Sequence, residues 1–206
     1  MYLWSNGTAY CDKDGKMEGY VDSDKALETY KMFQDMEKDG YAVATEKSGG
    51  DEFQAGQTGM FVYGALAVKK YTEEGVHFGL AKLPSFGSEK SASILSSSGV
   101  AIAKSSKNKE AAWEFVKYWT SEESNKTRIG TEFPVLMSVV ESEKILENPE
   151  YAPFYEMLDQ SGEYTPASFI MDKWSEVSEK LELAFEEMYN PSSLMDVKEA
   201  IASVLN

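Results

Sequence analysis

Residues 98–115 read SGVAIAKSSKNKEAAWEF, and this stretch decides the fold class. The small and β-branched residues at 100–103 predict a short buried strand directly after a glycine. Ser106 is a predicted helix N-cap, because its side chain can accept a hydrogen bond from the first helical turn. The predicted helix then carries one apolar face, made of Ala111, Ala112, Phe115, Val116 and Trp119. A strand that leads into an amphipathic helix indicates an α/β fold.

Further strands are predicted before this stretch. Residues 60–64 form a short apolar run between glycines, and residues 76–84 alternate apolar and polar side chains up to a proline. Near the N-terminus, Asp14-Gly15 between two short runs predicts a hairpin turn. The same acidic cluster is not a calcium loop by its spacing, because its glycine comes too early for the sixth position of that pattern.

The remaining pattern is mostly helical. The apolar spacing predicts a helix over residues 24–38, with Ser23 as N-cap and Gly40 as the stop signal. Further N-caps and one long amphipathic helix are predicted toward the C-terminus: Ser121, Ser138, Ser193 and residues 172–189. The sequence therefore predicts an α/β chain that is poor in strands and rich in helices toward its C-terminal end.

The composition is that of an acidic, folded chain. It has 206 residues, a formal net charge of −15 and a sequence pI of about 4.5. That length can bury a core in one large or two small domains, and aromatic residues spread along the chain argue against disorder. Because an acidic surface repels phosphate groups, neither a nucleic acid nor an anionic membrane is an expected partner.

Catalytic and metal-binding signatures are absent from the sequence. Cys11 is the single cysteine and His77 the single histidine, so there is no disulfide within the chain and no usual ligand set for zinc. Ser97 and Ser98 lie outside any nucleophile motif, and no phosphate-binding glycine loop occurs. His77 alternates away from the core face and is predicted to be solvated. We therefore expect no catalytic residue, no metal and no cofactor.

The N-terminus carries no recognisable export signal. Residues 1–7 lack a basic region, an apolar region and a cleavage site, and no stretch approaches the roughly 20 apolar residues of a membrane helix. The sequence as written is therefore either that of a cytoplasmic protein or one whose true N-terminus is missing.

Four motifs occur in a fixed order at residues 53–64, 78–84, 98–115 and 133–135. Together they resemble the family-1 extracellular solute-binding proteins, the maltose-binding-protein-like receptors of ABC importers. Residues 53–64 are similar to the family's F-x-x-G-x-x-A-M-x-x-x-G stretch, and residues 78–84 to its G-x-x-x-x-P strand. Residues 98–115 resemble its G-x-x-I-x-x-x-S-x-N-K-E-A-A-W-x-F segment, with a T-S-E-E turn at 120–123, and residues 133–135 resemble its L-P-V turn. The resemblance covers nearly all of the chain, and the order of the motifs makes it fairly specific.

The resemblance implies the C-terminal half of a receptor about twice as long. The expected fold is a helix-rich α/β C-terminal lobe of the type II periplasmic-binding-protein class, with most of the N-terminal lobe missing. Residues 1–103 and 151–206 resemble that C-terminal lobe, and residues 104–150 resemble helices that normally pack on the N-terminal lobe. The missing part would hold the signal or lipobox, so the full-length receptor is expected to be an extracytoplasmic lipoprotein, on the cell surface or in the periplasm.

The function implied by the resemblance is binding without catalysis. The receptor would capture a small-molecule ligand, a mono- or oligosaccharide, by hinge closure between two lobes and deliver it to the ABC permease subunits. The alternative is an orphan truncated lobe that acts as a protein-interaction module. A lobe without its partner exposes apolar surface, so self-association is then expected near residues 104–150.

Three places are candidate ligand contacts: Tyr63, Gly64 and Ala65; Ser97, Ser98 and Gly99; and Trp174. Family members often place a stacking tryptophan at the position of Ala65 or Leu66, and Tyr63 is either a stacking surface or a core residue. The serine-glycine run either offers hydroxyl and N–H groups or is an ordinary polar loop. Trp174 resembles the family's late aromatic at the cleft, and its place on an apolar stripe also fits core packing.

Overall fold

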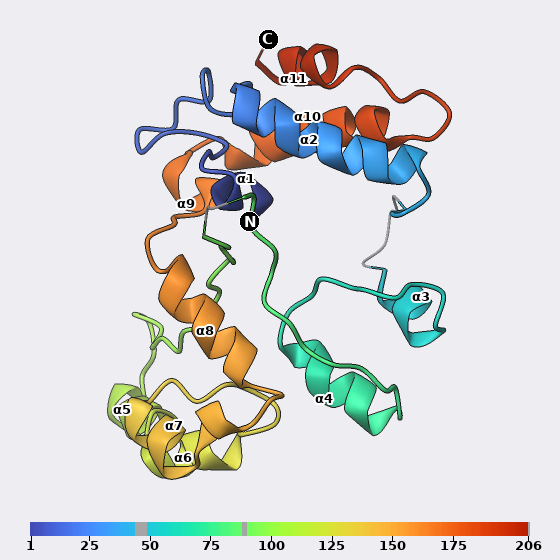
Figure 1. The fold of residues 1–206 in the computed structure, drawn as a ribbon. Coiled ribbons are helices and arrows are strands. Elements are labelled where there is room, and N and C mark those ends of the chain that lie inside the picture. Colours follow the sequence, from blue (N-terminus) through green and yellow to red (C-terminus); the bar gives the residue numbers. More distant parts are fainter. Residues whose placement is uncertain (44–48, 88–89, 206) are drawn as a thin grey trace. The chain divides into compact units, whose positions relative to one another are not determined.

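The chain folds into two units, each built from segments that lie far apart in the sequence. The computed structural model describes residues 1–43, 49–87 and 90–205 (Figure 1). Unit 1 comprises Met1–Gly50, Leu83–Ile94 and Gln160–Asn206, and unit 2 comprises Asp51–Lys82 and Leu95–Asp159. The predicted lobe boundaries after residues 103 and 150 concern a longer receptor and stay a prediction.

Unit 1 is a helical assembly around one apolar core. Its helices are α1 (Tyr2–Ser5), α2 (Asp24–Lys38), α9 (Ala167–Ile170), α10 (Trp174–Tyr189) and α11 (Val197–Leu205). The helices α2, α10 and α11 pack against one another, as the upper part of Figure 1 shows. Residues near the start of the chain therefore share a core with its last helices.

Side chains spaced three or four apart build this core. Helix α10 contributes Leu181, Ala184 and Met188, and α11 contributes Ile201 and Val204, among other buried residues. Met188 and Ile201 are completely buried. Because full burial of such a side chain stabilises a fold by about 1.5–3 kcal/mol, these residues hold α10 and α11 together.

Hydrogen bonds from two buried side-chain amides fix the orientation of α2 in this core. The Gln34 side chain on α2 donates hydrogen bonds from Nε2 to the carbonyl oxygens of Met188 (2.9 Å) and Met195 (2.7 Å). The Asn6 side chain, directly after α1, donates from Nδ2 to the carbonyl oxygen of Lys25 (2.8 Å). These bonds fix α2 to α10, to the turn after α10 and to the end of α1.

Unit 2 holds shorter helices. They are α3 (Gly50–Gln54, starting at the unit boundary), α4 (Leu66–Glu73), α5 (Lys109–Trp119), α6 (Glu122–Thr127), α7 (Met137–Ser142) and the 3-10 helix η1 (Ile145–Glu147). Helix α8 (Ala152–Ser161) begins in unit 2. None of these helices has the length and apolar character needed to cross a bilayer, and the same is true of every other helix in the described part of the chain.

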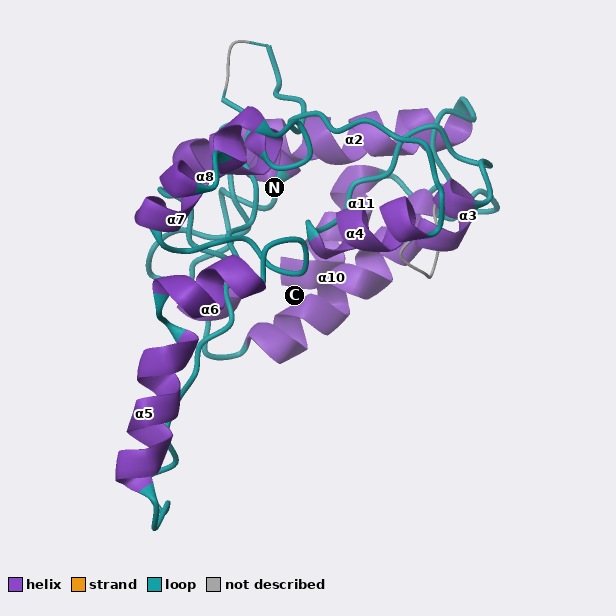
Figure 2. Ribbon diagram, turned by 90° about the horizontal axis from the view of Figure 1, so that it is seen from below, coloured by secondary structure: helices purple, strands orange, loops and turns teal. Residues whose placement is uncertain are grey.

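The predicted strands are not present among the described residues. Residues 60–64, 76–84 and 100–103 run as irregular chain, and the one isolated bridge joins Ile129 and Glu132 (Figure 2). A strand-forming run becomes a strand only when a neighbouring run supplies hydrogen bonds, and these runs supply none to one another. Around residues 60–64 the chain is held by aromatic packing instead: the Phe61 ring is stacked on the Phe53 ring, with 5.7 Å between the ring centres. The helix-rich part of the α/β prediction is thus confirmed, and the β part is not.

The predicted hairpin keeps its turn without its strands. The backbone N–H of Asp12 donates to the carbonyl oxygen of Lys16 (2.9 Å), and Gly15 has a φ of +84°. The Asp12 carboxylate accepts from the backbone N–H groups of Asp14 and Lys16, both at 2.9 Å. These N–H donors, chiefly that of Lys16, hold the pKa of Asp12 below its usual value.

Two predicted N-caps are confirmed. Helix α2 spans the predicted residues 24–38, and the Ser23 hydroxyl accepts from the backbone N–H of Ala26 (3.2 Å). Helix α6 follows Ser121, whose hydroxyl accepts from the N–H of Ser124 (3.2 Å). Both caps are local interactions, which explains why the sequence pattern alone located them.

Three other predicted N-caps are wrong. Helix α5 begins at Lys109, three residues after Ser106. The Ser106 hydroxyl accepts a hydrogen bond from the backbone N–H of Asn108, in the loop before the helix. Helix α7 begins at Met137, so Ser138 lies inside it, and its hydroxyl donates to the Glu122 carboxylate (2.5 Å). For α11 the cap is Asp196 in place of Ser193, since the Asp196 carboxylate accepts from the N–H of Lys198 (2.9 Å). A carboxylate is a stronger hydrogen-bond acceptor than a hydroxyl. In α11 the Asp196 carboxylate therefore caps the helix, and in α7 the Glu122 carboxylate accepts the hydrogen bond from the Ser138 hydroxyl.

A buried hydroxyl in unit 1 gives a test of the core. Tyr30 is 3% exposed, and within the described residues its hydroxyl has no hydrogen-bond partner. Burial raises the pKa of Tyr30 far above its usual value. Because an unsatisfied buried polar group costs about 1–3 kcal/mol, Tyr30→Phe is expected to raise the midpoint of thermal unfolding, measured by circular dichroism. A lower midpoint would show that the hydroxyl is satisfied; Tyr30→Ala, which empties the core position, serves as the destabilised reference.

Candidate functional site

Unit 2 contains a hollow of about 320 Å³ next to the first turns of α4. Three segments line it: α4 with the residue before it, the turn after α6, and the chain before α8. The lining residues are Ala65, Leu66, Val68, Lys69, Thr72, Glu73, Ile129, Gly130, Thr131, Glu132, Phe133, Glu150 and Tyr151. Its volume lies at the lower end of the range of about 300–1,000 Å³ that is typical of small-molecule sites.

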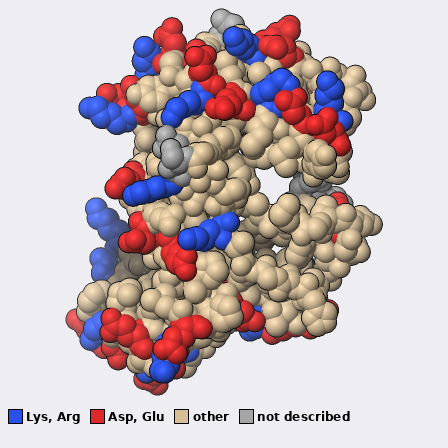
Figure 3. Space-filling model, viewed as in Figure 1, with Lys and Arg blue, Asp and Glu red and all other residues tan. Residues whose placement is uncertain are grey.

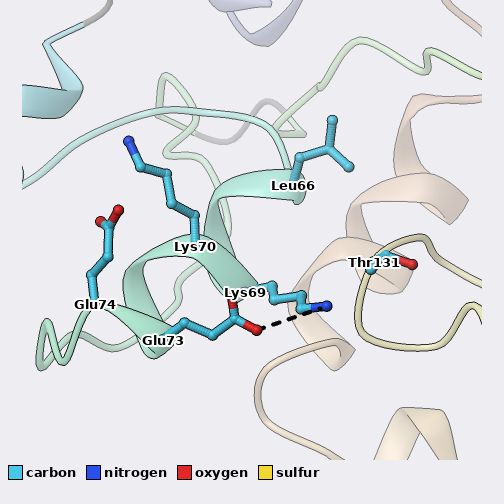
Figure 4. A pocket seen from close by; sticks show the side chains of 6 residues that line it. All are labelled: Leu66, Lys69, Lys70, Glu73, Glu74 and Thr131. Carbon is cyan, nitrogen blue, oxygen red and sulfur yellow. Dashed lines mark ion pairs between the residues drawn. The ribbon is translucent and has the colours of Figure 1, made fainter.

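The α4 side of the hollow is partly apolar and partly charged. Leu66 and Lys69 extend from α4 on the side where Thr131 lies, and Lys69 forms an ion pair with Glu73 at 3.8 Å (Figure 4). Leu66 is 73% exposed, so it presents an apolar surface at the mouth. The ion pair is itself well exposed and contributes little to stability.

A tight turn forms the opposite side. The backbone N–H groups of Thr131 and Glu132 both donate to the carbonyl oxygen of Arg128 at 3.0 Å, which closes the turn. Gly130 has a φ of +94°, a left-handed conformation that side-chain-bearing residues rarely adopt. The Tyr151 hydroxyl lies beside this glycine, 3.8 Å from the position that a Cβ would take.

Aromatic rings support the floor of the hollow. The Phe133 ring meets Tyr151 edge to face at 5.4 Å and lies 5.0 Å from Phe154 and 5.7 Å from Tyr155. The Tyr155 hydroxyl donates to the carbonyl oxygen of Pro134 (2.8 Å), and burial raises the pKa of Tyr155. Phe133 and Tyr151 are therefore held in place by neighbours and present half-buried rings to the hollow.

The polar side chains that line the hollow are carboxylates, hydroxyls and one ammonium group: Glu73, Glu132 and Glu150; Thr72, Thr131 and Tyr151; and Lys69. The carboxylates of Glu73 and Glu132 are paired with Lys69 and Arg128, respectively, whereas Glu150 makes no ion pair within the described part of the chain. Carboxylates and aromatic rings together suit a ligand with hydroxyl groups and an apolar face. Three acidic residues that could bind a metal ion do not converge here or elsewhere among the described residues.

The predicted ligand residues fall into both units. Ala65 lines the hollow, directly before α4, and Gly64 precedes it. Tyr63 is 58% exposed with one face stacked on Phe61 at 5.1 Å, so it is a surface ring and not a core residue. The face over α3 and α4 carries few charges in Figure 3, in agreement with the exposed apolar side chains there.

The other predicted contacts are not among the residues that line the hollow. Ser97, Ser98 and Gly99 form an exposed, irregular segment of unit 2. Trp174 begins α10 in unit 1, where it packs against the core with its ring 6.1 Å from that of Tyr10. Whether these residues contact a ligand stays a prediction.

Sequence reasoning missed most of the hollow. Phe133 belongs to a predicted turn motif, and no sequence motif marks Thr131, Glu150 or Tyr151 as a ligand contact. The glycine at 130 two residues before a Glu-Phe-Pro run is the one local signal that marks the turn. No pattern in the sequence brings Tyr151 to this turn.

Comparison with known proteins identifies the family. The profile described as bacterial extracellular solute-binding protein matches residues 1–126, which is more than half of the chain. The chain belongs to this family. No curated protein matches it as a relative.

A solved structure shows the same fold. The chain is similar to a cyclo/maltodextrin-binding protein whose structure was determined in complex with maltotetraose, with a TM-score of 0.73 and 18% sequence identity. The match covers 99% of this chain and 54% of that chain. This solute-binding family member therefore spans about half the length of the structure that it matches, and its helix-rich fold is that of the corresponding part.

The turn at Gly130 gives a test of how the hollow is built. Gly130→Ala forces a side chain into a left-handed conformation, which costs about 1–3 kcal/mol, so we expect a lower midpoint of thermal unfolding. Gly79→Ala is the matched control, since Gly79 has no positive φ and nothing lies within 4 Å of its added Cβ. Equal midpoints for the two variants would show that the turn is not constrained as described.

Proposed function

We propose that this chain is the C-terminal part of a carbohydrate receptor of an ABC importer. In that role the complete receptor captures a mono- or oligosaccharide between two lobes by hinge closure and passes it to the permease subunits. Family membership supports the receptor class, and the fold shared with a maltodextrin-binding protein supports a saccharide as ligand. The complete receptor would act outside the cytoplasm as a lipoprotein and would catalyse no reaction.

The observation that carries this proposal is the aromatic-lined hollow at the start of α4. Half-buried rings of Phe133 and Tyr151 offer flat apolar surfaces, and the neighbouring carboxylates and Thr131 offer hydrogen-bond partners for hydroxyl groups. The exposed ring of Tyr63 lies close in sequence to Ala65, which lines the same hollow. Within unit 2, we assign the ligand contacts to this hollow and to Tyr63, Gly64, Ser97, Ser98 and Gly99. Trp174 of unit 1 is a separate candidate contact, which the family resemblance implies.

A protein-interaction module is the second candidate function, and helix α5 is the observation that favours it. None of its residues is buried, although it carries Trp113, Phe115 and Tyr118, each more than 50% exposed. Large rings on a helix normally pack against a neighbour, so this helix offers a surface for a partner or a second copy. Self-association of the chain without any saccharide binding, seen by sedimentation, would favour this function over the receptor.

Binding by the chain itself is expected to be weak. If a second lobe supplies half of the contacts, neutral saccharides such as maltose and maltotetraose should bind this chain with affinities weaker than micromolar. Titration followed by amide NMR shifts should then place the perturbed residues around the hollow. The absence of any shift at high saccharide concentration contradicts the receptor function, and submicromolar binding measured by calorimetry contradicts the need for a second lobe.

The exposed ring of Tyr63 provides a mutational test. Tyr63→Ala should weaken saccharide binding by about two- to tenfold, the loss expected for one aromatic stacking contact, with little change in stability. Tyr41→Ala is the matched control, because Tyr41 is 80% exposed and belongs to unit 1. The same affinity for both variants would remove Tyr63 from the site.

A further inference from the structure

The side chain of Arg128 connects two helices to the turn that walls the hollow. Arg128 follows α6 directly and is the single arginine of the chain. Its Nη2 donates to the carbonyl oxygen of Trp119 at the end of α5 (2.8 Å), and its Nε donates to that of Ser124 in α6 (3.1 Å). The guanidinium carbon lies 4.1 Å from the centre of the Trp119 ring.

The same guanidinium reaches across the turn. Its Nη1 donates to the Glu132 carboxylate at 2.7 Å, and the Arg128 carbonyl oxygen accepts from the backbone N–H groups of Thr131 and Glu132. The Thr131 hydroxyl also donates to that carbonyl oxygen, at 2.8 Å. Backbone and side chain of one residue thus hold both ends of the segment Ile129–Glu132, all four residues of which line the hollow.

Arginine is suited to this arrangement in a way that lysine is not. Its planar group donates in several directions at once while one face stacks on an indole, whereas an ammonium group is a compact point charge. The side chain is also shielded, with 19% of its surface exposed, so its contact with Glu132 is less screened than those of the exposed ion pairs.

We propose that Arg128 is a positioning residue for the hollow: it holds the Ile129–Glu132 turn in the conformation that forms one wall and thereby sets the affinity for a saccharide. The first clause, that Arg128 holds the turn in its conformation, is tested without a ligand. The second clause, that Arg128 sets the affinity for a saccharide, rests on the proposed function.

The first experiment measures amide hydrogen exchange in Arg128→Gln, Arg128→Lys and Lys126→Gln. In Arg128→Gln the amides of Thr131 and Glu132 should exchange about tenfold faster or more, because the guanidinium bonds that support the turn, to the Glu132 carboxylate and to the carbonyl oxygens of Trp119 and Ser124, are lost. Arg128→Lys should not restore slow exchange. Lys126→Gln is the matched control: Lys126 lies on α6, two residues before Arg128, and forms its ion pair with Glu143 at 2.7 Å, away from the Ile129–Glu132 turn.

The second experiment measures maltotetraose affinity at a temperature where every variant is fully folded by circular dichroism. Weaker binding by both Arg128 variants, at least severalfold, with an unchanged Lys126→Gln variant supports the proposal. Unchanged turn exchange in Arg128→Gln overturns the first clause, and faster exchange with unchanged affinity overturns the second. If the unaltered chain binds no saccharide, both the proposed function and the second clause are wrong. The exchange data still decide the first clause, because they need no ligand.

Discussion

Packing between the beginning and the end of the chain is the constraint on which the structure depends. Helix α2 lies against α10 and α11, and the fully buried side chains of Met188 and Ile201 lie in the core that the three helices share. The two bonds from Gln34 fix the direction of this contact. Because this core draws on both ends of the chain, the segments between them are free to form a second unit, and that unit carries the hollow.

The hollow lies where α6 ends and α4 begins. Helix α6 ends at Thr127, the turn after it closes on the carbonyl oxygen of the next residue, Arg128, and Gly130 supplies the left-handed residue that the turn requires. Across the hollow, α4 begins at Leu66 without a side-chain cap. Short helices that end at defined points thus place hydrogen-bonding groups and aromatic rings together, which is the arrangement that a polyhydroxylated ligand requires.

Local features of this chain could be predicted, and features that depend on distant partners could not. The pattern at 24–38 and the hydroxyl of Ser23 identified α2 because a helix and its cap are made within one stretch. The runs at 60–64 and 100–103 have strand composition, yet a strand needs a partner, and here the rings of Phe53 and Phe61 stack instead. For the candidate site, the resemblance to solute-binding proteins points to Ala65, which lines the hollow; that it contacts a ligand stays a prediction. Tyr151 was missed because it reaches the turn through tertiary contacts alone.

The central claim is that this chain is part of a larger receptor outside the cytoplasm, and the size and location of the natural product test it most directly. An antibody against this chain would be used on cytosolic, membrane and extracellular fractions of the source cells. The account predicts a membrane-anchored or extracytoplasmic species much heavier than 23.0 kDa. A cytosolic species of 23.0 kDa would contradict it.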